Sequence, residues 1–170
     1  IASARKAGWI RGDMPYDVAA NCMSCHGLAN PAVDAAVFGK MLDAGHPFNA
    51  DFELLRYSQG TVRHRFYPPD MDVNGEMALA ELARFFVAGQ AAKLVSAHAA
   101  AGKGPAAYKK AQGSRLEAAK AALARVKAPE AAALVAKPSE ENARKLIAAI
   151  AAKDLSGELK GLFPAQADLK

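Results

Sequence analysis

Apolar residues recur at spacings of three and four along much of the 170-residue chain, which is the pattern of amphipathic helices. The pattern is strongest at Leu79, Leu82, Phe85 and Phe86. Asn74 is a suitable N-cap for this helix, which we expect to run through Val87 and, despite Gly89, on toward Ala101. No run of alternating apolar and polar residues is long enough to predict a sheet. The pattern therefore predicts an all-α protein.

Further helices are expected on both sides of this one. Before it, turn-forming residues separate two short helices, over residues 32–42 and 51–57. After it, residues 106–127 favour a helix that starts next to Pro105, and Ser139 is placed to cap a helix over residues 140–152. These later helices contain few large apolar residues, so each needs a neighbour. A C-terminal helical hairpin or small bundle is the expected arrangement.

Charge and composition both change near residue 90. Residues 1–90 carry eight Lys and Arg against ten Asp and Glu, a net charge of −2, whereas residues 91–170 carry fourteen against seven, a net charge of +7. Alanine makes up 26 of the last 80 residues, while nine of the eleven Phe and Tyr residues precede residue 90. We therefore expect two parts, a domain over residues 1–90 and an alanine-rich helical extension over residues 91–170.

The two cysteines of the chain lie in one short motif, Asn21-Cys22-Met23-Ser24-Cys25-His26, which contains C-x-x-C-H. Two thiols at this spacing can add to the two vinyl groups of a haem, and the following imidazole can bind the iron. A thioredoxin-like redox pair would need a βαβ context, and a zinc site would need further ligands at similar spacing. The sequence shows neither, so the motif predicts one covalently attached haem c.

From about residue 11 to residue 87, the chain resembles a monohaem class I c-type cytochrome. The matching features are the helix that ends in C-x-x-C-H, the Tyr67-Pro68-Pro69-Asp70-Met71 segment and the helix with Leu82, Phe85 and Phe86. This resemblance implies a class I cytochrome c fold over residues 1–90. It also implies that Cys22 and Cys25 attach the haem and that His26 is the proximal iron ligand.

The second axial ligand is where the sequence departs from the family, because Tyr67 stands directly before the two prolines where a methionine is usual. Met71 is the first candidate, since it is the methionine of this loop and a thioether raises the reduction potential. His64 would give bis-imidazole iron with a lower potential. Tyr67 itself is the third candidate, or the position is open for a small molecule.

The expected function is electron transfer, with no catalytic residues and no chemistry on a substrate. The basic excess of the C-terminal helices is a candidate docking surface for an acidic redox partner. The basic residues have no interleaved aromatic residues, which argues against nucleic-acid binding. No apolar stretch is long enough for a transmembrane segment.

Two alternatives remain open at this point: a haem-based sensor of small ligands such as gases, and the cytochrome subunit of a larger oxidoreductase complex. The departure at Tyr67 motivates the first, and the C-terminal extension motivates the second. In bacteria, the resemblance implies haem attachment outside the cytoplasmic membrane. We therefore expect a periplasmic protein from which the signal peptide has been removed.

Overall fold

The computed structural model describes residues 3, 6–48, 52–60, 66–67, 70–164 and 166–170, and helices account for most of them. The helices are α2 (Pro15–His26), α3 (Ala35–Asp43), α4 (Leu54–Ser58), α5 (Leu79–Ala101), α6 (Ala106–Leu123), α7 (Pro129–Ala136), α8 (Glu140–Ile150) and the short 3-10 helix η1 (Gln166–Asp168). A small antiparallel hairpin, β1 (Phe66–Tyr67) and β2 (Asp70–Asn74), precedes α5. The predicted all-α class is confirmed, with this hairpin as the only sheet in the described residues.

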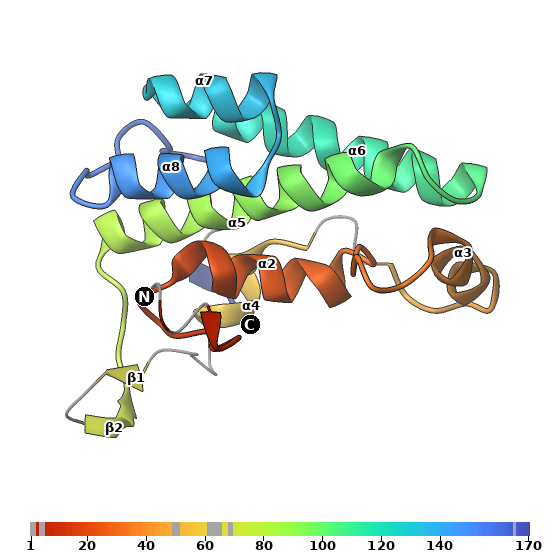
Figure 1. Cartoon of the computed structure of the whole chain (residues 1–170). Coiled ribbons are helices and arrows are strands. Elements are labelled where there is room, and N and C mark those ends of the chain that lie inside the picture. Colours follow the sequence, from red (N-terminus) through yellow and green to blue (C-terminus); the bar gives the residue numbers. More distant parts are fainter. Residues whose placement is uncertain (1–2, 4–5, 49–51, 61–65, 68–69, 165) are drawn as a thin grey trace.

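The long helix α5 is the centre of the molecule. Helices α2 and α4 pack on one side of it and α6 and α8 pack on the other, while α7 lies against α6 and α8 (Figure 1). Small side chains allow this close packing, because Ala88, Ala91 and Ala92 of α5 are buried and Gly89 lies against the side chain of Leu54. A Cβ at Gly89 would come within 3.1 Å of the Leu54 Cβ. The alanine-rich sequence thus lets one helix contact neighbours on several sides.

One apolar core runs through both predicted parts of the chain. It includes Met23 of α2, Phe86 of α5, Leu134 of α7 and Leu146 of α8. Helix α5 continues without a break through residue 90, as the sequence predicted when it extended this helix toward Ala101. The predicted boundary therefore falls inside a helix whose two halves share one core.

The predicted start of this helix is wrong. Asn74 lies at the end of β2, where it pairs with Phe66, and α5 begins only at Leu79. The backbone N–H of Ala78 donates to the Glu81 carboxylate at 2.8 Å, so the acidic residue of the first turn takes over the capping role. Asn74 was a misleading signal because asparagine favours turns and strand ends as well as helix caps.

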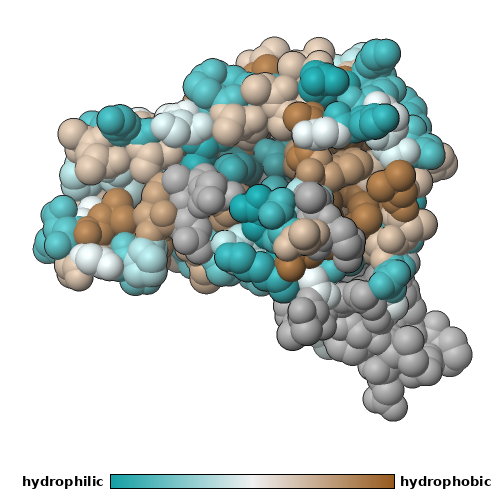
Figure 2. Space-filling model, turned by 180° about the vertical axis from the view of Figure 1, so that it is seen from behind, coloured by the Kyte–Doolittle hydropathy of each residue, from teal (hydrophilic) through white to brown (hydrophobic). Residues whose placement is uncertain are grey.

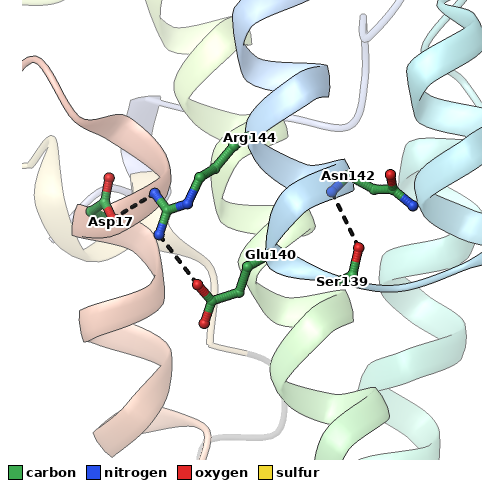
Figure 3. A network of polar contacts seen from close by, with 5 residues as sticks. All are labelled: Asp17, Ser139, Glu140, Asn142 and Arg144. Carbon is green, nitrogen blue, oxygen red and sulfur yellow. Dashed lines mark hydrogen bonds and ion pairs between the residues drawn. The ribbon is translucent and has the colours of Figure 1, made fainter. Parts of the chain in front are cut away.

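The C-terminal helices follow the prediction in part. Ser139 caps α8 by accepting a hydrogen bond from the Asn142 backbone N–H at 3.2 Å (Figure 3). Helix α6 starts after Pro105 but ends at Leu123, four residues before the expected end. Helix α7 was not predicted and starts at Pro129, where a proline suits the first helical turn.

The surface of the described residues is mixed in polarity. On the face opposite to that of Figure 1, separate apolar patches lie at the two ends of the molecule with polar residues between them (Figure 2). Large apolar side chains that are exposed are Trp9, Ile10, Val37 and Leu79. None of the helices in the described part of the chain is long and apolar enough to cross a membrane.

Candidate functional site

The C-x-x-C-H motif forms the last turn of α2. Because residues three and four apart share a helix face, Cys22, Cys25 and His26 lie together on one side of this turn. Both cysteines are free thiols, Cys25 and His26 are exposed, and Cys22 is half-buried. Burial raises the pKa of the Cys22 thiol. The turn therefore presents two thiols and an imidazole at neighbouring positions.

A Schellman motif closes α2 directly after His26. The backbone N–H of Ala29 donates to the Ser24 carbonyl at 3.2 Å, and the N–H of Leu28 donates to the Cys25 carbonyl at 3.0 Å. Leu28 has a φ of 45°, which is the left-handed conformation that glycine usually occupies at this place. This unfavourable conformation is held by burial, since Leu28 is almost fully inside.

Helix α6 binds the carbonyl groups that follow the motif. Gln112 Nε2 donates to the Gly27 carbonyl at 2.9 Å, and Arg115 Nη1 donates to the same carbonyl at 3.2 Å. Tyr108 Oη donates to the Leu28 carbonyl at 2.6 Å. The last carbonyls of a helix have no partner within the helix, so these side chains supply the missing donors. The three residues lie at spacings of four and three on the buried face of α6.

Arg115 makes the most extensive of these contacts. Its side chain is 1% exposed, and its guanidinium also donates to Gln112 Oε1 at 2.7 Å, Ser96 Oγ at 3.3 Å and the Met23 sulfur at 3.3 Å. A Cβ on Gly27 would collide with the Met23 carbonyl oxygen and with the Arg115 guanidinium, so glycine at this position permits their close approach. Burial lowers the pKa of Arg115 to about 10. The guanidinium still carries its proton at neutral pH.

An aromatic ring stacks on one face of the imidazole of His26. The ring of Phe52 stacks on it with a centroid distance of 4.2 Å and an interplanar angle of 2°. Tyr57 stacks on Phe52 at 5.1 Å, and the ammonium of Lys170 lies 4.9 Å from the Tyr57 centroid. The Lys93 ammonium donates to the Phe52 carbonyl at 3.3 Å, which ties this segment to α5. The stack orients the imidazole and shields one of its faces from water.

The opposite end of α2 is bound by α8. Arg144 Nη1 donates to the Asp17 carboxylate at 2.6 Å and Nη2 donates to Glu140 at 3.3 Å (Figure 3). The guanidinium carbon of Arg144 also lies 4.8 Å from the centroid of the Tyr16 ring. Both ends of α2 are thus held by an arginine from the C-terminal half of the chain.

Of the predicted distal ligands, only the backbones of Tyr67 and Met71 belong to the described part of the chain. The backbones of Tyr67 and Met71 lie in the β1–β2 hairpin, which projects from the helices at the end away from His26 (Figure 1). His64 lies outside the described residues, as do the side chains of Tyr67 and Met71. The choice among the three therefore stays a prediction.

The residues of the turn fit a covalently attached haem. Covalent attachment of haem c needs two free thiols at this spacing and an imidazole next to the second thiol, whereas a bare metal ion needs several ligands at one point. The described residues contain no group of three or more His, Cys, Asp or Glu side chains that could hold a bare metal ion. Cys22 and Cys25 would hold the haem and His26 would bind its iron.

Sequence reasoning missed the side chains that support the turn. The sequence placed Tyr108, Gln112 and Arg115 on a helix of the basic C-terminal extension and gave them no role. One signal was present, because these three residues share the face of α6 on which Ala119 and Leu123 are also buried. Phe52 gave no comparable signal, since its contact with His26 depends on how the chain folds back.

Comparison with known proteins identifies no relative. No family model matches the chain, and no curated protein or solved structure shows significant similarity to it.

Proposed function

We propose that this protein is a c-type cytochrome that carries one covalently attached haem c and transfers single electrons. One observation carries the proposal: Cys22, Cys25 and His26 lie as two free thiols and an imidazole on one helical turn. The family resemblance of residues 11–87 supports the same conclusion. When bound, the haem supplies a one-electron iron couple, which no amino-acid side chain of the turn can replace.

The chain's own residues would perform three tasks for this group. Cys22 and Cys25 bind it, and the exposed position of Cys25 leaves that thiol open to reaction. His26 is held in orientation by the stack with Phe52, which also excludes water from one face of the imidazole. The hydrogen bonds from α6 fix the backbone after His26, so the turn does not need to reorganise when the iron changes its charge.

The location and the partners follow from the same proposal. Bacteria attach haem c outside the cytoplasmic membrane, so the protein is assigned to the periplasm. An acidic redox partner would dock on the basic C-terminal helices, where Lys109, Lys110, Arg125 and Lys127 are exposed. This arrangement also suits a cytochrome subunit of a larger oxidoreductase complex.

The test is expression in the periplasm of a bacterium that attaches haem c. We expect one haem per chain that remains bound after denaturation, measured as the pyridine haemochrome and by haem staining of a denaturing gel. Cys22→Ser with Cys25→Ser should remove the covalent haem completely, because no thiol then remains for the thioether bonds. Ser24→Ala, in the same turn, is the matched control and should retain it.

Two results would contradict the proposal. A folded wild-type protein without covalent haem would exclude a c-type cytochrome. Rapid binding of carbon monoxide to the reduced haem would instead favour the sensor function over electron transfer, because it requires an open or weakly held sixth position.

A further inference from the structure

A buried cation lies directly behind the turn that carries the C-x-x-C-H motif. Arg115 reaches from α6 to the Gly27 carbonyl and to the Met23 sulfur, which belong to residues on either side of Cys25 and His26. Its other hydrogen-bond acceptors are Gln112 Oε1 and Ser96 Oγ. Arg115 forms no salt bridge within the described residues, because none of their carboxylates lies within ion-pair distance of its guanidinium.

This charge is unusual for a protein interior. Buried arginines are normally paired with a carboxylate, because desolvation of an isolated charge costs several kcal/mol. Here the compensation comes from neutral oxygens and from the negative end of the α2 dipole, which points at the guanidinium. The Nε atom of Arg115 is buried and has no hydrogen-bond partner in the described part of the chain. The guanidinium therefore keeps a largely uncompensated positive charge.

We propose that Arg115 is a positioning residue that holds the attachment turn and, through its buried charge, raises the reduction potential of the haem assigned to Cys22, Cys25 and His26. The inference rests on the proposed function. It goes beyond it because it assigns the control of the potential to a residue in the C-terminal extension.

The direction of the effect follows from electrostatics. Oxidised haem iron carries one more positive charge than reduced iron, so a nearby fixed cation disfavours the oxidised state. Of the two residues that contact Arg115, Met23 lies in the last turn of α2 with the two cysteines and His26, and Gly27 directly follows that turn. The charge thus lies within about one helix diameter, roughly 10 Å, of the side chains that would hold the haem. The buried residues Met23 and Gly27 lie next to the guanidinium, so screening on this side of the turn is weak.

Two variants remove the net charge in different ways. Arg115→Gln removes the cation and keeps a hydrogen-bond donor. Gln112→Glu keeps Arg115 and places a carboxylate on the atom that now accepts from Nη1 at 2.7 Å, with almost no change in shape. We measure the midpoint potential of each variant by spectroelectrochemical titration. At a given applied potential, each variant should have a ratio of reduced to oxidised protein about tenfold lower than the wild type. For one electron this equals a midpoint potential lower by about 59 mV.

Two further variants serve as controls. Lys109→Gln removes one exposed charge from the same helix and should leave the midpoint potential unchanged, because water screens that position. Arg115→Lys retains the charge while losing the planar geometry, so its potential should stay close to that of the wild type. A loss of potential in Arg115→Lys equal to that in Arg115→Gln would overturn the role of the charge.

The outcomes separate this inference from the proposed function. A wild-type protein without covalent haem would overturn both. Covalent haem in the wild type together with an unchanged potential in either folded Arg115→Gln or folded Gln112→Glu would overturn only the inference. Thermal melting and haem content of each variant show that it is folded and loaded.

Discussion

The two ends of α2 are each held by an arginine from the C-terminal helices, but the two arginines have opposite surroundings. Arg144 binds the first turn through the carboxylates of Asp17 and Glu140, and 30% of its side chain remains exposed. Arg115 binds the last turn through neutral oxygens and a sulfur, and only 1% of it is exposed. The first is an ordinary ion pair whose charges cancel. The second brings an uncancelled charge to the turn with the cysteines.

This difference indicates a division of roles along one helix. The charges of an exposed ion pair cancel each other and are hydrated. Such a pair contributes little to stability and almost nothing to the electrostatic potential inside the protein. A buried charge without a counterion is costly to the fold, so its presence next to Cys22, Cys25 and His26 suits a role in that site. Two experiments on these arginines test the comparison between the two ends of α2, and a third tests Glu53, which is next to the ring that stacks on His26.

The largest effect is expected for Arg115→Ala. The substitution leaves a cavity beneath the turn and leaves the Gln112 Oε1 acceptor without its present donor. These losses outweigh the desolvation cost of the buried charge that the substitution relieves, so we expect a net loss of about 3 kcal/mol in the free energy of unfolding, measured by urea denaturation. Lys109→Ala on the exposed side of α6 is the control. A cost for Arg115→Ala no greater than that for Arg144→Ala would remove the distinction between the two ends.

A smaller, pH-dependent effect is expected at Glu53, next to Phe52. Burial raises the pKa of Glu53 above its usual 4.5, while hydrogen bonds from the backbone and the charges of Lys93 and Arg56 oppose the rise only in part. A carboxyl with a raised pKa in the folded state binds its proton more tightly there than in the unfolded chain. The free energy of unfolding therefore falls as the pH rises from about 4.5 through the higher folded pKa.

Glu53→Gln should remove this decline, because the amide keeps an oxygen that can accept from the Arg56 N–H and carries no charge. We expect the variant to be more stable than the wild type at pH 7, with the difference disappearing below pH 4.5. Thermal melting as a function of pH measures it. Parallel pH profiles of the two proteins would show that Glu53 is not the group responsible.

The smallest effect is expected for Arg144→Gln. Its ion pairs with Asp17 and Glu140 are partly hydrated, so their loss should cost at most about 1 kcal/mol. Added salt should weaken the wild-type contribution further. In the haem-loaded protein, the midpoint potential should be the same as in the wild type. If Arg144→Gln shifted the midpoint potential as much as Arg115→Gln does, the two arginines would have the same influence on the haem, and the distinction between a buried and a hydrated charge would be wrong.

The sequence alone determined the features that depend on neighbouring residues. Ser139 was identified as the cap of α8, the helix through Gly89 was extended correctly, and the C-x-x-C-H motif placed two thiols and an imidazole on one turn. Each of these follows from spacing or local hydrogen bonding over a few residues. The same local logic failed at Asn74, because a strand end and a helix cap favour the same side chain.

Only the tertiary structure decided what surrounds the motif. Arg115 contacts Met23 across 92 positions of sequence, and Tyr108 contacts Leu28 across 80. On a helix rich in Lys and Ala, the sequence does not distinguish a buried arginine from a solvated one, since burial depends on which helix packs against it. From the sequence, the net charge of +7 on residues 91–170 was expected to lie on the surface of the C-terminal helices. The fold buried Arg115 and Lys93 of that extension, and for Arg115 the close approach at Gly27 and the unpaired carbonyls at the end of α2 supplied acceptors.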